Sequence, residues 1–345
     1  MNVSIVGAGG DIGREVAVRL IQDRIIGREA LLQMVGRPDG SSGTLLYGFV
    51  SDLLDAYSEN SPRLEVVLEP DGVRGDIIIF CAGRTLSTDP RVPGDRNALA
   101  ESNVPVFETY AQAIARVAKG EEIIIVVSNP VELAVHVFSK YIDPTKIIGM
   151  GAFLDTIRFR REIAADLGVR RQMVRGLVIG QHGPGMVPLW SSVGAFGMDN
   201  EEGWEKLRQS RERNRMTPQE AIHAVRDLLA AGKVKAATAK VREMPPDLRV
   251  FAGPYVTHMT GAKTRVGTAG IVLRLIETIT TGNQVLTACQ TKVCGEFLGV
   301  SSVIGVPVLL NNQGIVHIHP LDIWEEEEEA FRRSAEMINE LISQY

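Results

Sequence analysis

The chain has 345 residues, of which 45% are hydrophobic, and its formal net charge at pH 7 is −5. This length and composition are enough to bury a full core, and they exclude an intrinsically disordered chain. A slightly acidic chain has no global positive field, so the composition favours a small-molecule partner over nucleic acid or an anionic membrane. No apolar run reaches the roughly 18 residues of a transmembrane helix, and no basic leader precedes the first apolar run. We therefore expect a cytoplasmic protein.

The cysteines are few and odd in number, at positions 81, 289 and 294. They show none of the paired spacings of a metal site, and an odd set fits a reducing compartment better than a disulfide framework. Cys81 ends an apolar run and is expected in the core. The sequence predicts no bound metal.

Short apolar runs alternate with helical patterns through the first half of the chain. We expect strands at residues 3–6, 31–35, 64–68, 77–81, 123–127 and 147–150. Each run is too apolar for a strand with one face in water, so the strands should form a parallel sheet covered by helices on both faces. The sequence predicts a doubly wound α/β domain over residues 1–150.

The second half, residues 151–345, is less regular and reads as an α+β domain that holds the substrate and the catalytic groups. Helical patterns lie at 152–167, 218–231, 265–281 and 325–343, and strand-like runs at 174–179 and 303–310. Residues 197–254 are polar and rich in Arg, Glu and Met. We interpret this segment as an added helical excursion and assign no chemistry to it.

A glycine cluster follows the first expected strand directly. Gly7, Gly10 and Gly13 have the spacing G-x-x-G-x-x-G, with Asp11 and Ile12 between them, and a helical pattern begins at once. Glycines are needed there because the turn is tight, the backbone must approach a pyrophosphate closely, and bare N–H groups of the helix must face the anion. A purely structural turn is the alternative. The strand–turn–helix context favours a Rossmann-type dinucleotide site.

The end of the second expected strand bears on the choice of cofactor. NAD enzymes place an acidic residue there to bind the ribose hydroxyls, whereas this chain has Gly36 followed by Arg37. An arginine offers a charge-assisted fork to a 2′-phosphate, which a carboxylate would repel. We therefore predict that NADP is preferred and that NAD is possible. In the alternative, Asp39 takes the role of the acidic residue and Arg37 is a surface charge.

Three residues of the second half suggest catalysis. His182 lies in the glycine-flanked stretch Gly180-Gln181-His182-Gly183 at the end of a strand-like run. Asp155 and Arg158 are three residues apart, on one face of an expected helix. The other five histidines have no comparable setting and are expected on the surface or in the core.

Asp155, Arg158 and His182 together resemble the pattern of the malate and lactate dehydrogenase family, with the malate dehydrogenases closest. The resemblance covers nearly the whole chain, and further segments match in the order of the family: Ala82-Gly83, the loop Arg91–Arg96, Asn103, Ser128-Asn129-Pro130 and Ser334-Ala335-Glu336.

The resemblance implies an oxidoreductase that moves a hydride between a nicotinamide cofactor and a small 2-hydroxy acid, with malate and oxaloacetate as the expected pair. His182 would be the general base, and Asp155 would fix its tautomer and stabilise the imidazolium. Arg158 would clamp the C1 carboxylate. Arg96 would polarise the C2 oxygen, and Asn129 would orient it.

The resemblance also places Arg91 against the distal carboxylate of the substrate, and Thr264 against nicotinamide or substrate. It implies a homo-dimer or a homo-tetramer. It adds further cofactor-binding residues to the glycine loop: Ala82, Gly83, Asn103, Ser128 and Asn129.

Three alternative functions stay open. The same scaffold could serve a lactate-type enzyme or another 2-hydroxy acid dehydrogenase. A related NAD-dependent glycosidase needs a metal, and no Cys or His lies near Ser128 to bind one. A non-catalytic NAD(P)-sensing protein could share the fold, but it would be expected to lose its catalytic side chains, and Asp155, Arg158 and His182 are all present.

Overall fold

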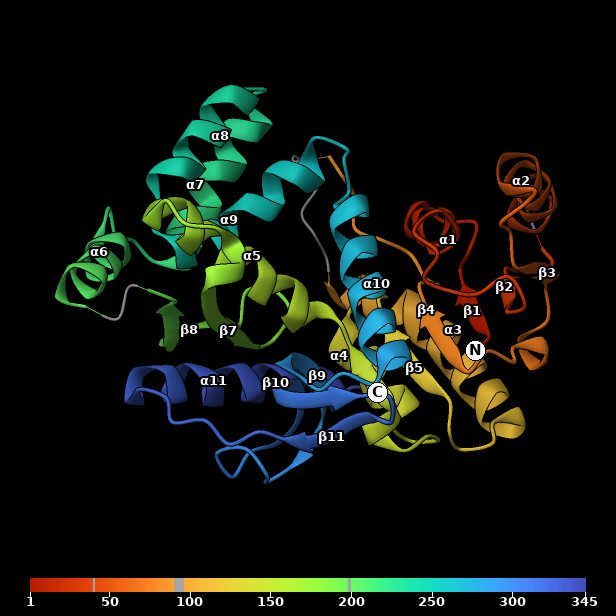
Figure 1. The fold of residues 1–345 in the computed structure, drawn as a ribbon. Helices are drawn as coiled ribbons and strands as arrows, with labels where there is room; N and C mark the ends of the chain where they lie inside the picture. The colour runs from red at the N-terminus through yellow and green to blue at the C-terminus, as the bar shows by residue number, and fades with distance from the viewer. Residues whose placement is uncertain (40, 90–95, 198–199) are drawn as a thin grey trace.

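The computed structural model describes residues 1–39, 41–89, 96–197 and 200–345, without the side chains of Ser41 and Arg96. The first half alternates strands and helices, as predicted (Figure 1). In chain order its elements are β1 (Val3–Val6), α1 (Asp11–Gln22), β2 (Leu31–Val35), α2 (Ser41–Tyr57), β3 (Arg63–Val67), β4 (Ile77–Phe80), α3 (Arg96–Val117), β5 (Ile123–Val126), α4 (Val131–Phe138) and β6 (Ile147–Gly149).

The strands of the first half lie in the order β3-β2-β1-β4-β5-β6, and every neighbouring pair is parallel. Strands β1, β4, β5 and β6 are buried along their whole length, which explains their continuous apolar sequences. This is the strand order of a doubly wound dinucleotide-binding fold, and the predicted fold class is confirmed.

Strands β3, β4, β5 and β6 end one residue before the predicted end. Cys81, Val127 and Met150 were expected to close β4, β5 and β6, but each lies just beyond its strand and lines a cavity. Cys81 is half-buried and packs against the main core cluster at the edge of the cavity, and its burial raises the pKa of the thiol to about 12. These apolar residues therefore belong to the carboxyl edge of the sheet, where the chain leaves the strands.

The second half contains α5 (Gly151–Leu167), β7 (Val174–Gly180), β8 (Met186–Ala195), α6 (Glu201–Glu212), α7 (Pro218–Ala230), α8 (Val234–Glu243), α9 (Pro246–Met259), α10 (Arg265–Thr281), β9 (Val285–Cys294), β10 (Ser301–Asn311), β11 (Gly314–Ile318) and α11 (Glu325–Ile342). Helices α6 to α9 confirm the helical excursion, and they lie at the end of the molecule away from β2 and β3 (Figure 1). Across the described ranges, no helix has both the length and the apolarity to cross a membrane.

One sheet of eleven strands runs through both halves of the described chain. It crosses the predicted boundary at residue 150 through the pair Gly149 and Gln290, and it continues from β10 to β7 through Gly305 and Gly180. A Cβ atom on Gly149 would lie 2.6 Å from Cβ of Gln290, and one on Gly305 would lie 2.6 Å from the carbonyl oxygen of Gly180. The division into domains 1–150 and 151–345 therefore stays a prediction, because one continuous sheet includes strands from both.

Strands β8, β9 and β11 were not predicted. Strand β9 has polar residues at buried positions, where Gln290 and Thr291 are 0% and 2% exposed. The alternation of apolar and polar residues could not reveal such a strand, because its polar side chains form hydrogen bonds in the interior and do not face water. The side chain of Gln290, for example, accepts a hydrogen bond from the backbone N–H of Ala152 at 3.0 Å.

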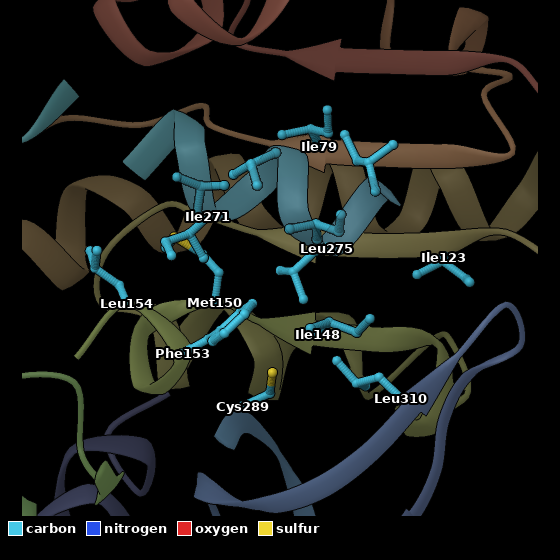
Figure 2. Packing of buried hydrophobic residues seen from close by; sticks show 14 of the residues in the cluster. Ile79, Ile123, Ile148, Met150, Phe153, Leu154, Ile271, Leu275, Cys289 and Leu310 are labelled. Carbon is cyan, nitrogen blue, oxygen red and sulfur yellow. The ribbon is translucent and has the colours of Figure 1, made fainter. Parts of the chain in front are cut away.

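Helix α10 joins the second half of the chain to the first. Figure 2 shows the side chains of Ile271 and Leu275 lying among the strand residues Ile79 and Ile148 and beside Phe153 of α5. All five belong to one buried cluster. The core is thus shared between the two halves, and this shared core fixes where α5 and the loops beside it lie relative to the sheet.

We expect the substitution Leu275→Ala to lower the free energy of unfolding by about 2–5 kcal/mol, since it opens a cavity in this shared core. Leu275 is 1% exposed, whereas Val266 on the same helix is 58% exposed. The matched control Val266→Ala should change stability by no more than about 0.5 kcal/mol. Urea unfolding measures both, and equal effects would contradict the packing described for α10.

Candidate active site

A cavity of about 600 Å³ lies at the carboxyl ends of β1, β4 and β5. Strand β1 is the point at which the strand order reverses, with β2 on one side and β4 on the other. Ligands of open α/β sheets bind in the crevice at such a point. The lining combines the glycine loop at the start of α1 with residues from α5, the His182 loop, α9 and α10.

The glycine loop is tightly packed against the sheet. Gly7 has a φ of +87°, and a Cβ atom on it would lie 2.8 Å from the backbone nitrogen of Ala82. A Cβ atom on Gly13 would lie 2.5 Å from the carbonyl oxygen of Gly7. No side chain caps the start of α1, where Gly10, Asp11 and Ile12 line the cavity. The residues present therefore fit a pyrophosphate, which would meet the uncapped N–H groups and the positive end of the helix dipole.

Gly36 and Arg37 follow β2, beside the glycine loop but outside the lining of the cavity. The backbone N–H of Gly7 donates to the carbonyl oxygen of Val35 at 2.9 Å. Gly36 is buried, and a Cβ atom there would lie 2.5 Å from Cδ1 of Leu46 in α2. An acidic side chain at this position would have to displace Leu46, whereas Arg37 is exposed.

The structure brings Asp155, Arg158 and His182 together. Nδ1 of His182 lies 2.6 Å from Oδ2 of Asp155, and Nη1 of Arg158 donates to Oδ1 of the same carboxylate at 2.9 Å. Asp155 is 1% exposed, and both partners line the cavity. Burial opposes ionisation of this carboxyl, but the charges and hydrogen bonds of His182 and Arg158 outweigh it and hold the pKa of Asp155 below its ordinary value.

The pairing of Nδ1 with Asp155 decides how His182 can act. A carboxylate on Nδ1 fixes the ring orientation and the tautomer, and it stabilises the imidazolium. Nε2 is then the atom that would exchange a proton with a substrate hydroxyl. Within the described residues, no group of three or more His, Cys, Asp or Glu side chains could hold a metal ion.

Three hydrogen bonds hold the loop that carries His182, two from neighbouring helices and one within the loop. The backbone N–H of Gln181 donates to Oγ of Ser334 in α11 at 2.9 Å, and the N–H of Gly185 donates to Oε1 of Gln181 at 3.0 Å. The N–H of His182 itself donates to Oε1 of Glu132 in α4 at 2.6 Å. Two carboxylates thus position the histidine, with Glu132 holding its backbone and Asp155 its ring.

Glu132 was missed in the sequence, although it lies two residues after Pro130 of the matching segment Ser128-Asn129-Pro130. It is 2% exposed and lines the cavity. A glutamate in the first turn of a helix reads from sequence as a favourable charge at the helix terminus. Only the contact between the His182 loop and α4 shows that Glu132 also accepts the hydrogen bond of the His182 backbone.

Asn103 and Ser128 hold the loops beside the cavity. Asn103 is fully buried and does not line the cavity; its Nδ2 donates to the carbonyl oxygens of Arg84 and Asn129, and its Oδ1 accepts from the N–H of Arg84 at 2.7 Å. Ser128 lines the cavity, and its Oγ donates to the carbonyl oxygen of Ala82 at 2.6 Å. Both residues therefore shape the walls of the site through its backbone.

Of the remaining candidate residues, three line the cavity and two have side chains that the structure does not describe. Gly83, Asn129 and Thr264 line the cavity. Arg91 lies outside the described residues, and Arg96 is described only as the first residue of α3, without its side chain. The roles expected of these two arginines stay predictions.

The helical excursion contributes a wall of the cavity, although no chemistry was assigned to it from sequence. Ile222 of α7 and Phe251, Pro254 and Tyr255 of α9 line the cavity. His258 was expected to be a surface or core residue; it lines the cavity too, and its Nε2 lies 3.0 Å from the carbonyl oxygen of Ser87. Sequence patterns could not place these residues, because only the fold of α9 against α5 brings them over the sheet.

Comparison with known proteins identifies the family of this chain. Residues 1–149 match the family model described as lactate/malate dehydrogenase, NAD binding domain. A malate dehydrogenase of Methanothermobacter thermautotrophicus is 30% identical, over 99% of this chain and 95% of its own length. The chain belongs to the lactate/malate dehydrogenase family. The family expected from the sequence is confirmed, and with it the expectation of an oxidoreductase.

Other relatives show the breadth of the family. An L-2-hydroxycarboxylate dehydrogenase (NAD(P)(+)) of Methanocaldococcus jannaschii is 28% identical, over 98% of this chain and 97% of its own length. The solved lactate dehydrogenase of Cryptosporidium parvum has a TM-score of 0.69 at 20% identity, over 99% of this chain and 97% of that one. At that identity, the likeness between the structures shows the fold alone.

Proposed function

We propose that the protein is a dehydrogenase that interconverts malate and oxaloacetate with a nicotinamide cofactor, preferring NADP. The single observation that carries this proposal is the meeting of His182, Asp155 and Arg158 beside an uncapped glycine loop in one cavity. Hydride transfer from a 2-hydroxy acid requires three groups: a base, here fixed by a buried carboxylate, a guanidinium for the substrate carboxylate, and a loop that binds the cofactor phosphates. From the resemblance to the family, we further propose a homo-dimer or a homo-tetramer, and from the sequence we propose that it is cytoplasmic.

The residues of the chain divide the work of this reaction. His182 would take the proton of the C2 hydroxyl when malate is oxidised and return it when oxaloacetate is reduced. A bound nicotinamide would supply the hydride acceptor or donor for this reaction. Asp155 keeps the imidazole in position through both steps. Arg158 has further N–H donors beside the one that Asp155 accepts, and they bind the C1 carboxylate. Asn129 and Arg96 orient and polarise the C2 oxygen.

The cofactor preference rests on the end of β2. The M. jannaschii relative is named for both NAD and NADP. In this chain, Leu46 occupies the space that an acidic side chain at position 36 would need, and Arg37 is exposed beside it. These features favour a 2′-phosphate over bare ribose hydroxyls.

The substrate assignment rests on Arg91 and on the relatives. Several related chains are named malate dehydrogenase, and an arginine at position 91 would pair with a distal carboxylate. A second candidate is a 2-hydroxy acid with an apolar side chain, which the wall formed by Ile222, Phe251 and Tyr255 favours. A buried, unpaired guanidinium over an apolar substrate would be costly, so the two candidates predict opposite selectivity.

The substitution His182→Ala should lower kcat by about 10²- to 10⁴-fold, since it removes the general base, while cofactor binding stays unchanged. Steady-state reduction of oxaloacetate and fluorescence titration with NADPH measure the two quantities. The matched control His223→Ala changes an exposed histidine of α7 and should leave both unchanged. A His182→Ala variant that turns over at nearly the original rate would remove His182 from the mechanism.

The substitution Arg37→Ala should lower the ratio of kcat/KM for NADPH to that for NADH by about tenfold or more, because a charge-assisted hydrogen bond to the 2′-phosphate is lost. The control is Arg63→Ala, an exposed arginine at the amino end of β3, whereas Arg37 follows the carboxyl end of β2; this control should leave the ratio unchanged. If Arg37→Ala also leaves the ratio unchanged, the preference depends on Asp39 or on another basic group.

Initial rates with oxaloacetate, pyruvate and 4-methyl-2-oxopentanoate test the substrate. The unmodified protein should prefer oxaloacetate, and Arg91→Gln should shift the kcat/KM ratio toward pyruvate by about tenfold or more, which corresponds to about 1.4 kcal/mol of differential transition-state binding. Equal rates with oxaloacetate and pyruvate would overturn the malate assignment but keep the dehydrogenase class. Preference for 4-methyl-2-oxopentanoate would establish the second candidate.

A further inference from the structure

A lysine from the second half of the chain reaches across the cavity to the glycine loop. Lys263 lies in the turn between α9 and α10, and Asp11 is the first residue of α1. Nζ of Lys263 lies 3.1 Å from Oδ2 of Asp11, and both residues line the cavity. The ion pair therefore connects the catalytic half of the chain to the loop that would hold the dinucleotide.

Asp11 places a negative charge where a pyrophosphate must approach. The hydrogen bond from Lys263 lowers the pKa of Asp11; burial opposes this shift, but the charge of Lys263 and the contact with Arg14 lower the pKa further, so the carboxyl is ionised at neutral pH. A second anion at the start of α1 would be repelled by this carboxylate. A dinucleotide site built around Asp11 therefore needs a cation close to the same point.

The backbone of the turn is unusual at this lysine. Lys263 and Thr264 have φ values of +54° and +53°, so two consecutive residues with side chains adopt the left-handed conformation. Such residues persist only where the surrounding structure imposes them, and they gather at ligand-binding and catalytic sites. This conformation places Lys263 against the glycine loop and Thr264 in the lining of the same cavity.

The other positively charged residues of the cavity lining make different contacts. Three described lining residues carry a permanent positive charge: Arg84, Arg158 and Lys263. Arg158 is bound to Asp155, and the backbone N–H of Arg84 donates to Asn103. Among the three, Lys263 is the one whose charged atom contacts a residue of the glycine loop.

We propose that Lys263 is a cofactor-binding residue, which pairs with Asp11 in the free protein and neutralises the pyrophosphate when a dinucleotide binds at the start of α1. The proposal rests on the proposed use of a nicotinamide dinucleotide. It differs from the role of Arg37, because the pyrophosphate is common to NADH and NADPH whereas the 2′-phosphate belongs to NADPH alone. Lys263 therefore contributes affinity for both cofactors and selectivity for neither.

The test is the dissociation constant of NADH and of NADPH, measured by fluorescence titration of the full chain without substrate. Lys263→Met should raise both constants by about tenfold or more and by the same factor, which corresponds to about 1.4 kcal/mol of binding free energy. Asp11→Asn should lower both constants, since it removes the repelling charge. In the double variant, Lys263→Met should still weaken binding several-fold relative to Asp11→Asn alone.

Three outcomes separate this proposal from its alternatives. If the double variant binds both cofactors as tightly as Asp11→Asn alone, Lys263 only neutralises Asp11 and the proposal is wrong. An unchanged Kd in Lys263→Met, with Arg37→Ala still altering the NADPH preference, overturns this proposal and keeps the proposed function. If the unmodified protein binds neither cofactor, the proposed function itself fails. Lys206→Met, which breaks a remote ion pair with Glu202 on α6, is the matched control and should leave both constants unchanged.

Discussion

The site depends on one buried carboxylate. Asp155 is almost completely buried. One of its carboxylate oxygens contacts the imidazole of His182, and the other accepts a hydrogen bond from the guanidinium of Arg158. A buried anion is stable only when it is paired and hydrogen-bonded, so Asp155 requires both partners as much as it positions them. Removal of this carboxylate would leave a guanidinium and an ionisable ring facing each other inside the protein. His182, the proposed base, and Arg158, the proposed substrate clamp, therefore form a single electrostatic unit with Asp155.

The scaffold places that unit at a fixed distance from the cofactor loop. A single sheet passes from the first half to the second through the close contact of Gly149 with Gln290, and α10 packs its apolar face onto both halves. The first turn of α5 follows β6 directly, so Asp155 is held relative to the carboxyl edge of the sheet. Hydride transfer depends on such rigid positioning, because small displacements of the reacting groups cost large factors in rate.

The helical excursion takes part in the cavity. Helices α7 and α9 were assigned no chemistry, yet Ile222 and Phe251 reach the cavity, and the turn after α9 carries Lys263 to the glycine loop. The excursion thus supplies an apolar wall of the cavity, and the turn that follows α9 supplies a cation beside the glycine loop. Function in such proteins is set by residues placed on a common fold rather than by the fold itself.

The sequence by itself determined the doubly wound sheet, the glycine loop and the pattern of Asp155, Arg158 and His182, because strand burial, tight turns and helical spacing are local and leave periodic or short-range patterns. Only the tertiary structure decided that Glu132 braces the backbone of His182, that the buried polar strand β9 carries the sheet into the second half, and that Lys263 meets Asp11. These contacts join residues from 50 to 252 positions apart. No local pattern records them, since each member reads alone as an ordinary surface charge or helix terminus, and its role arises only where the packed elements bring the two together.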